Sequence, residues 1–226
     1  MPVYPEAKIA SLDIGIPLAE FTADERAHFD AYWDVILPQY ESVLYNAIQP
    51  YRERVEWLIR AVKAKIERSV KFEGQLPTDQ NLGISFVKPE HIHLGSTPAN
   101  VAAVNGDAMT VKFPDNWVQV ATGQMHEEAG VVLFGIIAYS NADVIDGIRF
   151  TVGQRTLPPV DLSKLKLADN KNGINIWKFD TIYILPKDTY TIELHSDKAD
   201  SANPPSAEFA FLGFTVGTGA FLKQYF

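Results

Sequence analysis

The sequence predicts a mostly β protein, in which an N-terminal helical arm precedes an antiparallel β-sandwich of the jelly-roll type. Helical periodicity dominates residues 1–74, whereas short segments rich in Val, Ile, Phe, Tyr and Thr fill residues 84–226. No segment of helical length and period separates these later strands, so a parallel sheet of βαβ units is not expected. Residues 75–83 combine Gly, Pro and polar side chains and are the predicted linker.

The helical arm is expected to begin near Ala23, because Thr22 and Glu25 have the spacing of a capping box. Pro38 and Pro50 are expected to interrupt it, since proline lacks a backbone N–H and clashes with the preceding turn. The expected helices therefore cover residues 23–37, 39–49 and 51–72.

The third expected helix carries one apolar stripe, formed by Tyr51, Val55, Leu58, Ile59, Val62, Ile66 and Val70. Its other face mixes basic and acidic side chains, which is typical of a solvated amphipathic helix, with nucleic acid or lipid as the alternative partner. An apolar stripe has to pack against the sandwich or another subunit. We therefore predict that Tyr51, Arg60 and Lys63 lie at assembly contacts.

Nine segments have strand composition: 84–87, 101–104, 108–113, 117–121, 131–139, 148–153, 174–185, 189–194 and 207–217. Asn172-Gly173 and Pro186-Lys187-Asp188 are expected turns. The run VVLFGIIAY at 131–139 is uninterrupted by polar residues, which predicts a central strand that is buried on both faces.

Composition excludes several classes of function. The net charge of −8 does not favour attraction to nucleic acid or to an anionic membrane. Without cysteine the chain has no disulfide, zinc ribbon or thiol chemistry. The first residues lack the basic start and apolar core of a secretory signal, and the longest apolar run is too short to span a bilayer. We expect neither a signal peptide nor a membrane span.

His91 and His93, in PEHIHLGST, are the first candidates for chemistry. Alternate residues of a strand share one face, so both imidazoles could bind one metal ion, as in the first histidine pair of cupin-type sites. No acid follows them at the expected spacing, and only His126 or His195 could complete the ligand set. A metal-dependent, cupin-like enzyme is therefore an alternative, and surface or interface histidines are the preferred interpretation.

Other catalytic patterns are incomplete. MHEEAG at 125–130 lacks the second histidine of a helical zinc site, and no phosphate-binding, dinucleotide-binding or nucleophile-elbow motif occurs. Asp143 and Asp146 could form a carboxylate pair for calcium or acid–base work, but Asn, Asp and Gly gather in turns for backbone reasons alone. We expect no enzyme, no bound metal and no cofactor.

Aromatic side chains offer a second alternative function. Trp117, Trp177, Tyr183 and Tyr190 could form a platform for a carbohydrate or cell-surface ligand, although core packing explains most of them. The terminal Tyr225 and Phe226 are predicted assembly contacts, because an aromatic chain end is easily donated to a neighbouring subunit.

The segment FDTIYILPKDTYTIELHSDKADSANPPSAEFAFLGFTVGTGAF, residues 179–221, resembles the C-terminal part of single jelly-roll virion proteins of bacterial and archaeal viruses. The resemblance implies a capsid or capsid-associated subunit and no catalytic residue. We therefore predict a structural, self-assembling protein whose partners are its own copies and other virion proteins. It would be found in the virion, or in the cytoplasm of the producing cell before assembly.

Overall fold

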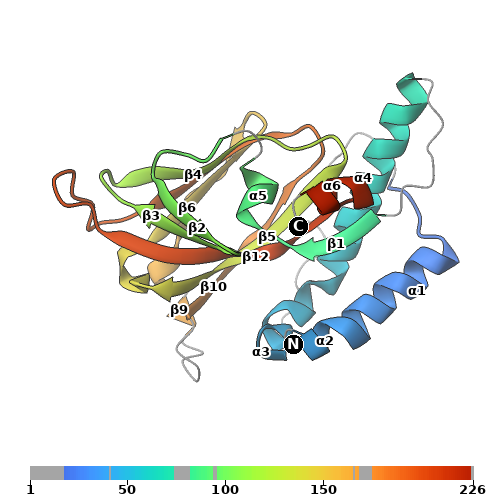
Figure 1. Cartoon of the computed structure of the whole chain (residues 1–226), viewed down its shortest axis with the longest axis horizontal. Helices are drawn as coiled ribbons and strands as arrows, with labels where there is room; N and C mark the ends of the chain where they lie inside the picture. Colours follow the sequence, from blue (N-terminus) through green and yellow to red (C-terminus); the bar gives the residue numbers. More distant parts are fainter. Residues whose placement is uncertain are drawn as a thin grey trace. The chain divides into compact units, whose positions relative to one another are not determined.

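The computed structural model describes residues 18–40, 42–73, 82–93, 96–164, 166–167 and 175–224. The chain divides into two compact units, Met1–Asp79 and Gln80–Phe226. Helices make up the described part of the first unit, and two antiparallel sheets make up most of the second (Figure 1). The predicted fold class, a β-sandwich with an N-terminal helical region, is confirmed. The predicted linker, 75–83, lies outside the described residues up to position 81.

The helical unit begins where the capping box predicts. Helix α1 (Ala23–Ala31) follows Thr22, whose hydroxyl accepts from the backbone N–H of Glu25 (3.2 Å), while the Glu25 carboxylate accepts from the Thr22 N–H (2.7 Å). The predicted break at Pro38 is wrong. The chain continues through the π-helix η2 (Tyr32–Ile36) into α2 (Leu37–Tyr40), because the wider π turn ahead of the proline accommodates its missing N–H.

The second predicted interruption, at Pro50, is confirmed. Helix α3 (Ser42–Ile48) ends in the 3₁₀ turn η3 (Gln49–Tyr51), which contains Pro50, and α4 (Arg52–Glu73) follows. Within the apolar stripe, Val55, Leu58 and Val62 are fully buried. The amphipathic pattern therefore identified the buried face of α4 correctly.

Ion pairs connect α1 to α4 in antiparallel order. Glu25 pairs with Lys63 (2.8 Å) and Asp30 with Arg52 (2.5 Å), so residue numbers rise along α1 as they fall along α4. Between them, Arg26 makes a two-pronged contact with Glu56 (2.7 and 2.8 Å), and this hydrogen bonding lowers the pKa of Glu56. The two helices thus form a hairpin fixed by charge as well as by apolar packing.

The second unit contains a seven-stranded and a five-stranded sheet. The larger sheet has the order β2-β3-β12-β5-β10-β9, with β1 also paired to β12; the smaller has the order β4-β11-β6-β7, with β8 paired to β6. The bounds are β1 Leu82–Phe86, β2 Val101–Asn105, β3 Ala108–Lys112, β4 Trp117–Gln124, β5 Ala129–Ser140, β6 Gly147–Val152, β7 Arg155–Thr156, β8 Val160–Asp161, β9 Lys166–Leu167, β10 Asn175–Ile184, β11 Thr189–His195 and β12 Ser206–Thr218. Short helices are α5 (Pro89–Ile92), η4 (Ala142–Val144), η5 (Leu162–Lys164) and α6 (Gly219–Gln224).

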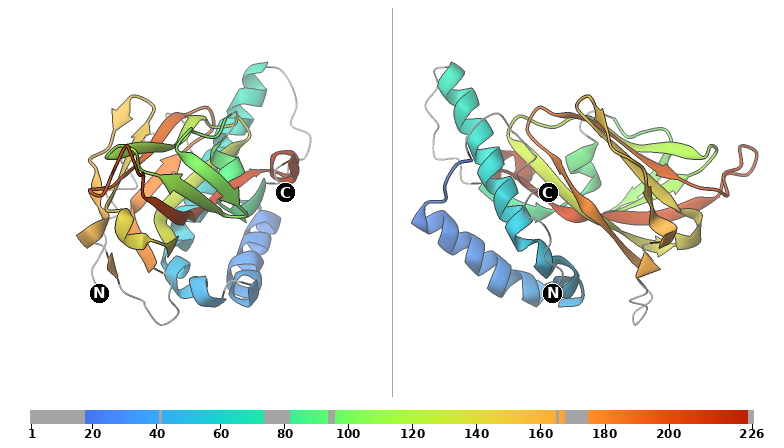
Figure 2. Two further views of the ribbon diagram at one scale, coloured as in Figure 1. Left: turned by 60° about the vertical axis from the view of Figure 1, so that its left-hand side comes forward. Right: turned by 180° about the vertical axis from the view of Figure 1, so that it is seen from behind.

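The strand pairing is that of a jelly roll. Antiparallel pairs nest along the chain: β3 pairs with β12, β4 with β11, β5 with β10, and β6 with β7. Rolling up such a nested ribbon alternates the pairs between two sheets, which places β3-β12-β5-β10 in one and β4-β11-β6-β7 in the other. Figure 2 shows the two sheets from the side, with the long β12 running through the larger one.

Strand β5 is the central buried strand that its apolar run predicts. It lies between β12 and β10, and its first ten residues are all buried. Val131 and Leu133 face the core between the sheets, whereas Phe134 packs on the opposite face, 6.1 Å from the Phe214 ring of β12. Both faces of β5 are therefore covered.

All nine predicted strand segments correspond to strands, while the two-residue strands β7, β8 and β9 were not predicted. The turn at Pro186-Lys187-Asp188 is confirmed: Lys187 has a φ of 68° and the Asp188 N–H bonds to the Leu185 carbonyl (3.0 Å). The expected turn at Asn172-Gly173 lies outside the described residues. Across the described ranges, no helix is both long enough and apolar enough to cross a membrane.

Candidate functional site

The histidine pair does not form a shared site. His91 lies in helix α5 and His93 directly after it, so the alternative in which both project from one face of a strand toward one metal ion is wrong. The preferred interpretation as surface or interface histidines is wrong for His91, because its side chain is buried. The His91 Nδ1 contacts the Thr215 hydroxyl of β12 (2.9 Å) and accepts from the Lys88 N–H (3.1 Å). The His93 Nε2 contacts the Val120 carbonyl of β4 (2.7 Å). The two imidazoles thus hydrogen-bond to different strands, His91 to β12 and His93 to β4.

His91 is a buried packing residue. Only 1% of it is exposed, and its ring lies 6.0 Å from that of Phe221. Burial, aided by the nearby Lys88 ammonium, lowers the pKa of His91 to about 4. Burial also lowers the pKa of His93. Both side chains are therefore neutral near pH 7, and each ties α5 to a strand.

The aromatic platform considered from the sequence is not assembled. Trp177, Tyr183 and Tyr190 are 2%, 5% and 3% exposed, and the Tyr190 hydroxyl donates to the Ile92 carbonyl (2.7 Å). Burial strongly raises the pKa of that phenol. Three of the four rings therefore belong to the interior, and only Trp117 remains partly exposed.

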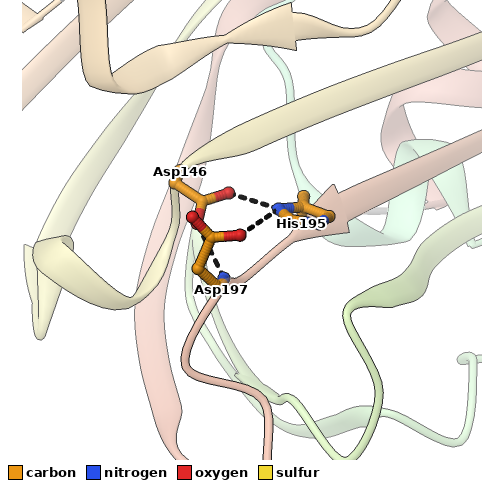
Figure 3. Close-up of side chains that lie close together, drawn as sticks. All are labelled: Asp146, His195 and Asp197. Atoms are coloured by element: carbon orange, nitrogen blue, oxygen red, sulfur yellow. Dashed lines mark hydrogen bonds and ion pairs between the residues drawn. The ribbon is translucent and has the colours of Figure 1, made fainter.

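A carboxylate–histidine cluster lies at one end of the smaller sheet (Figure 3). The His195 Nδ1 lies 2.5 Å from Asp146 Oδ1 and 3.8 Å from Asp197 Oδ1. Register explains the arrangement: His195, the last residue of β11, is paired with Gly147, the first residue of β6, and so lies beside Asp146. The second oxygen of Asp146 accepts from the Asp197 N–H (2.7 Å).

These three side chains are the group within the described part of the chain whose ligand atoms lie close enough to hold a metal ion, all within 4.8 Å of one another. One imidazole and two carboxylates suit a divalent transition metal. The hydrogen bonds of Asp146 give the cluster a structural role, because they hold the His195 ring and the Asp197 N–H at the start of the loop after β11. Asp143, considered as an alternative carboxylate partner of Asp146, pairs with Lys198 and lies in the 3₁₀ turn η4, in agreement with the preferred interpretation of this segment as a turn.

Trp117 connects this cluster to its neighbours on the same sheet. Its ring lies 4.7 Å from the His195 ring and 4.4 Å from the Arg149 guanidinium, centre to centre. Arg149 also pairs with Glu193 of β11 (2.7 Å). The contacts run from β4 through β11 to β6 and hold the Trp117 ring between two cationic or polar partners.

The predicted assembly contacts have partners inside the helical unit. Arg60 donates to the Ala19 carbonyl (2.9 Å), and Lys63 binds the Glu25 carboxylate and the Glu20 carbonyl (3.2 Å). Tyr51 is half-buried in η3. These contacts lie within one chain, and the assembly role of the three residues stays a prediction. Tyr225 and Phe226 lie outside the described residues.

The edge of the larger sheet at β2 is exposed and uncharged. Within the described ranges, β2 pairs only with β3, and four of its five residues are exposed, including Val104 at 37%. No Asp, Glu, Lys or Arg occurs between Glu90 and Asp107. Sequence reasoning identified this strand but not its position at an edge, which depends on pairing with distant β12.

The sequence matches no protein-family model and no curated protein. Among solved structures, the chain is similar to the CBM36-1 domain of a multidomain xylanase from the hindgut metagenome of Trinervitermes trinervoides, at 12% identity and a TM-score of 0.32, over 61% of this chain and 97% of that one. It is also similar to the structure of infectious bursal disease virus Gx strain (9%, TM-score 0.30, 61% and 32%) and to the cupin domain of Schizosaccharomyces pombe Cnp3 (9%, TM-score 0.25, 66% and 69%). Likenesses with TM-scores this low carry no argument about function.

Proposed function

We propose that the chain is a structural subunit that works by assembling with copies of itself, in a virion or a similar particle. The observation that carries the proposal is the exposed, uncharged edge strand β2. Proteins that remain monomeric protect such edges with charged residues, proline, β-bulges, very short strands or a covering segment. Strand β2 has a register shift at Val101–Ala103, and its regular part, Ala103–Asn105, has no charge or proline. Four exposed residues of β2 carry no charge and include no proline.

The helical unit offers a second contact surface. Val35 and Ile36, adjacent residues of the π-helix η2, are 55% and 44% exposed. Neighbouring apolar side chains on a surface otherwise rich in ion pairs are typical of an interaction site. The resemblance of residues 179–221 to virion proteins supports a particle subunit, and the jelly-roll strand order is compatible with it.

Light scattering on the purified native protein, with negative-stain images of the same sample, tests this function. A defined oligomer, ring or particle is the expected result. A monomer at every concentration measured would contradict it.

Carbohydrate binding is the competing function, and Trp117 is the residue on which it depends. Its ring is partly exposed but already contacts His195 and Arg149, whereas a sugar platform requires an open ring face. A metal-dependent enzyme would have to bind its metal ion at Asp146, His195 and Asp197, because the His91 and His93 imidazoles contact different strands and do not share a site.

A further inference from the structure

We propose that β2 pairs with β2 of a second copy of the chain across a twofold axis, so that the larger sheet of one subunit continues into that of the other. This inference rests on the proposed self-assembly and names its contact.

The edge itself defines the chemistry of the partner. A strand at the end of a sheet presents N–H and C=O groups that only another extended strand satisfies along their whole length. The edges at β1, β4, β7, β8 and β9 differ from β2. Strands β7, β8 and β9 have two residues each, β1 is half-buried over most of its length, and the edge of β4 is contacted by His93 at the Val120 carbonyl.

The sequence of β2 suits pairing with itself. The register of β2 on β3 shifts between Val101 and Ala103, so the regular part of the strand is Ala103–Asn105. An antiparallel twofold pair centred on this part places Val104 opposite Val104 of the other copy. Ala103 then faces Asn105. No like charges meet, and β-branched residues directly opposite each other stabilise an antiparallel pair.

Turn geometry leaves the strand accessible. Gly106, with a φ of 59°, makes the tight turn from β2 to β3, and nothing lies within 4 Å of the position that a Cβ would occupy there. The turn end of the hairpin is therefore open within this chain. A pair this short is weak by itself, and a particle would gain stability from repeating it together with other contacts.

Disulfide trapping tests the pairing, because the native chain contains no cysteine. Residues directly opposite in an antiparallel pair have Cα atoms about 4.5–5.5 Å apart, which lies within the range that a disulfide bridges. Under mild oxidation, V104C is expected to form a covalent dimer at least about tenfold faster than A202C. Ala202 is an exposed control in the loop before β12.

A charge variant provides a second readout. V104K places two ammonium groups opposite each other across the twofold axis, and is expected to weaken self-association measured by sedimentation. A202K adds the same charge away from the axis and is expected to leave association unchanged. Folding of each variant is checked by circular dichroism.

The outcomes separate the two proposals. If the native protein assembles but V104C and A202C cross-link at equal rates, the β2 pairing is wrong and self-assembly stands. If the native protein is a monomer and V104C still cross-links selectively, the β2 pairing is supported, and the proposal that the native protein forms a stable particle is wrong. A monomer without selective cross-linking overturns both.

Discussion

Lowering the pH is expected to weaken the sandwich through the buried side chain of His91, in addition to His93, whose pKa burial also lowers. The pKa of His91 is about 4 in the folded protein and 6.5 in an unfolded chain. Between these values the unfolded chain binds a proton that the folded protein excludes, so the free energy of unfolding falls as the pH drops from about 6.5 to about 4. A gap of about 2.5 pH units, at about 1.4 kcal/mol each, corresponds to about 3–4 kcal/mol, of which roughly 2–3 kcal/mol is lost between about pH 7 and about pH 4.5.

Urea unfolding at about pH 7 and about pH 4.5 measures this loss. The variant His91→Gln keeps a polar side chain but cannot take up the proton, so its stability should depend on pH less than that of the native protein. His28→Gln, an exposed histidine of α1, is the matched control and should retain the native pH dependence. If the native protein and His91→Gln lose equal stability between the two pH values, burial of a neutral His91 is not the cause.

Three further outcomes are expected. Gly213→Ala should lower the free energy of unfolding by more than about 2 kcal/mol, because the new Cβ would lie 2.1 Å from the Val132 carbonyl oxygen. Gly219→Ala, which has open space at the Cβ position, should lower it little. Equal thermal unfolding of the two variants would refute the reasoning. Asp146→Asn should lower stability by about 1–2 kcal/mol, because Asp146 holds both the His195 ring and the Asp197 N–H, whereas Asp143→Asn, in an exposed ion pair, should lower it by less than about 0.5 kcal/mol. Urea unfolding that ranks the two variants in reverse would contradict this structural role of Asp146. Tryptophan fluorescence should show no saturable response to soluble oligosaccharides, and a response that Trp117→Ala abolishes would favour the carbohydrate-binding function.

Local patterns predicted the local structure well. The Thr22–Glu25 spacing identified the start of α1, and alternation with turn residues identified nine strands, because capping and strand preference act within a few residues. The error at Pro38 has a local cause too: a π turn absorbs the proline, and no residue type signals such a turn. The error at His91 was avoidable, since Pro89 at the first turn of α5 favours a helix.

The clusters could not be predicted in the same way. Asp146 and His195 are 49 residues apart and meet only because β11 pairs with β6 in one register. A shift of one residue would turn His195 to the other face of the sheet. The exposure of β2 likewise follows from β3 pairing with β12 near the end of the chain. Such contacts depend on the strand order. The alternating pattern of apolar residues does not reveal it, because several sandwich topologies share that pattern.

The edge strands β4 of the smaller sheet and β2 of the larger sheet differ in what covers them, and the difference bears on the proposed assembly. On the smaller sheet, the His93 imidazole hydrogen-bonds to the Val120 carbonyl of β4, and its lowered pKa keeps the ring neutral. On the larger sheet, β2 has no such cover among the described residues and no charge of its own. Added strands would therefore join the larger sheet, whose centre, β5 and β12, is the most continuously buried part of the sandwich. The proposed β2 pairing would join the larger sheets of two copies into one continuous layer.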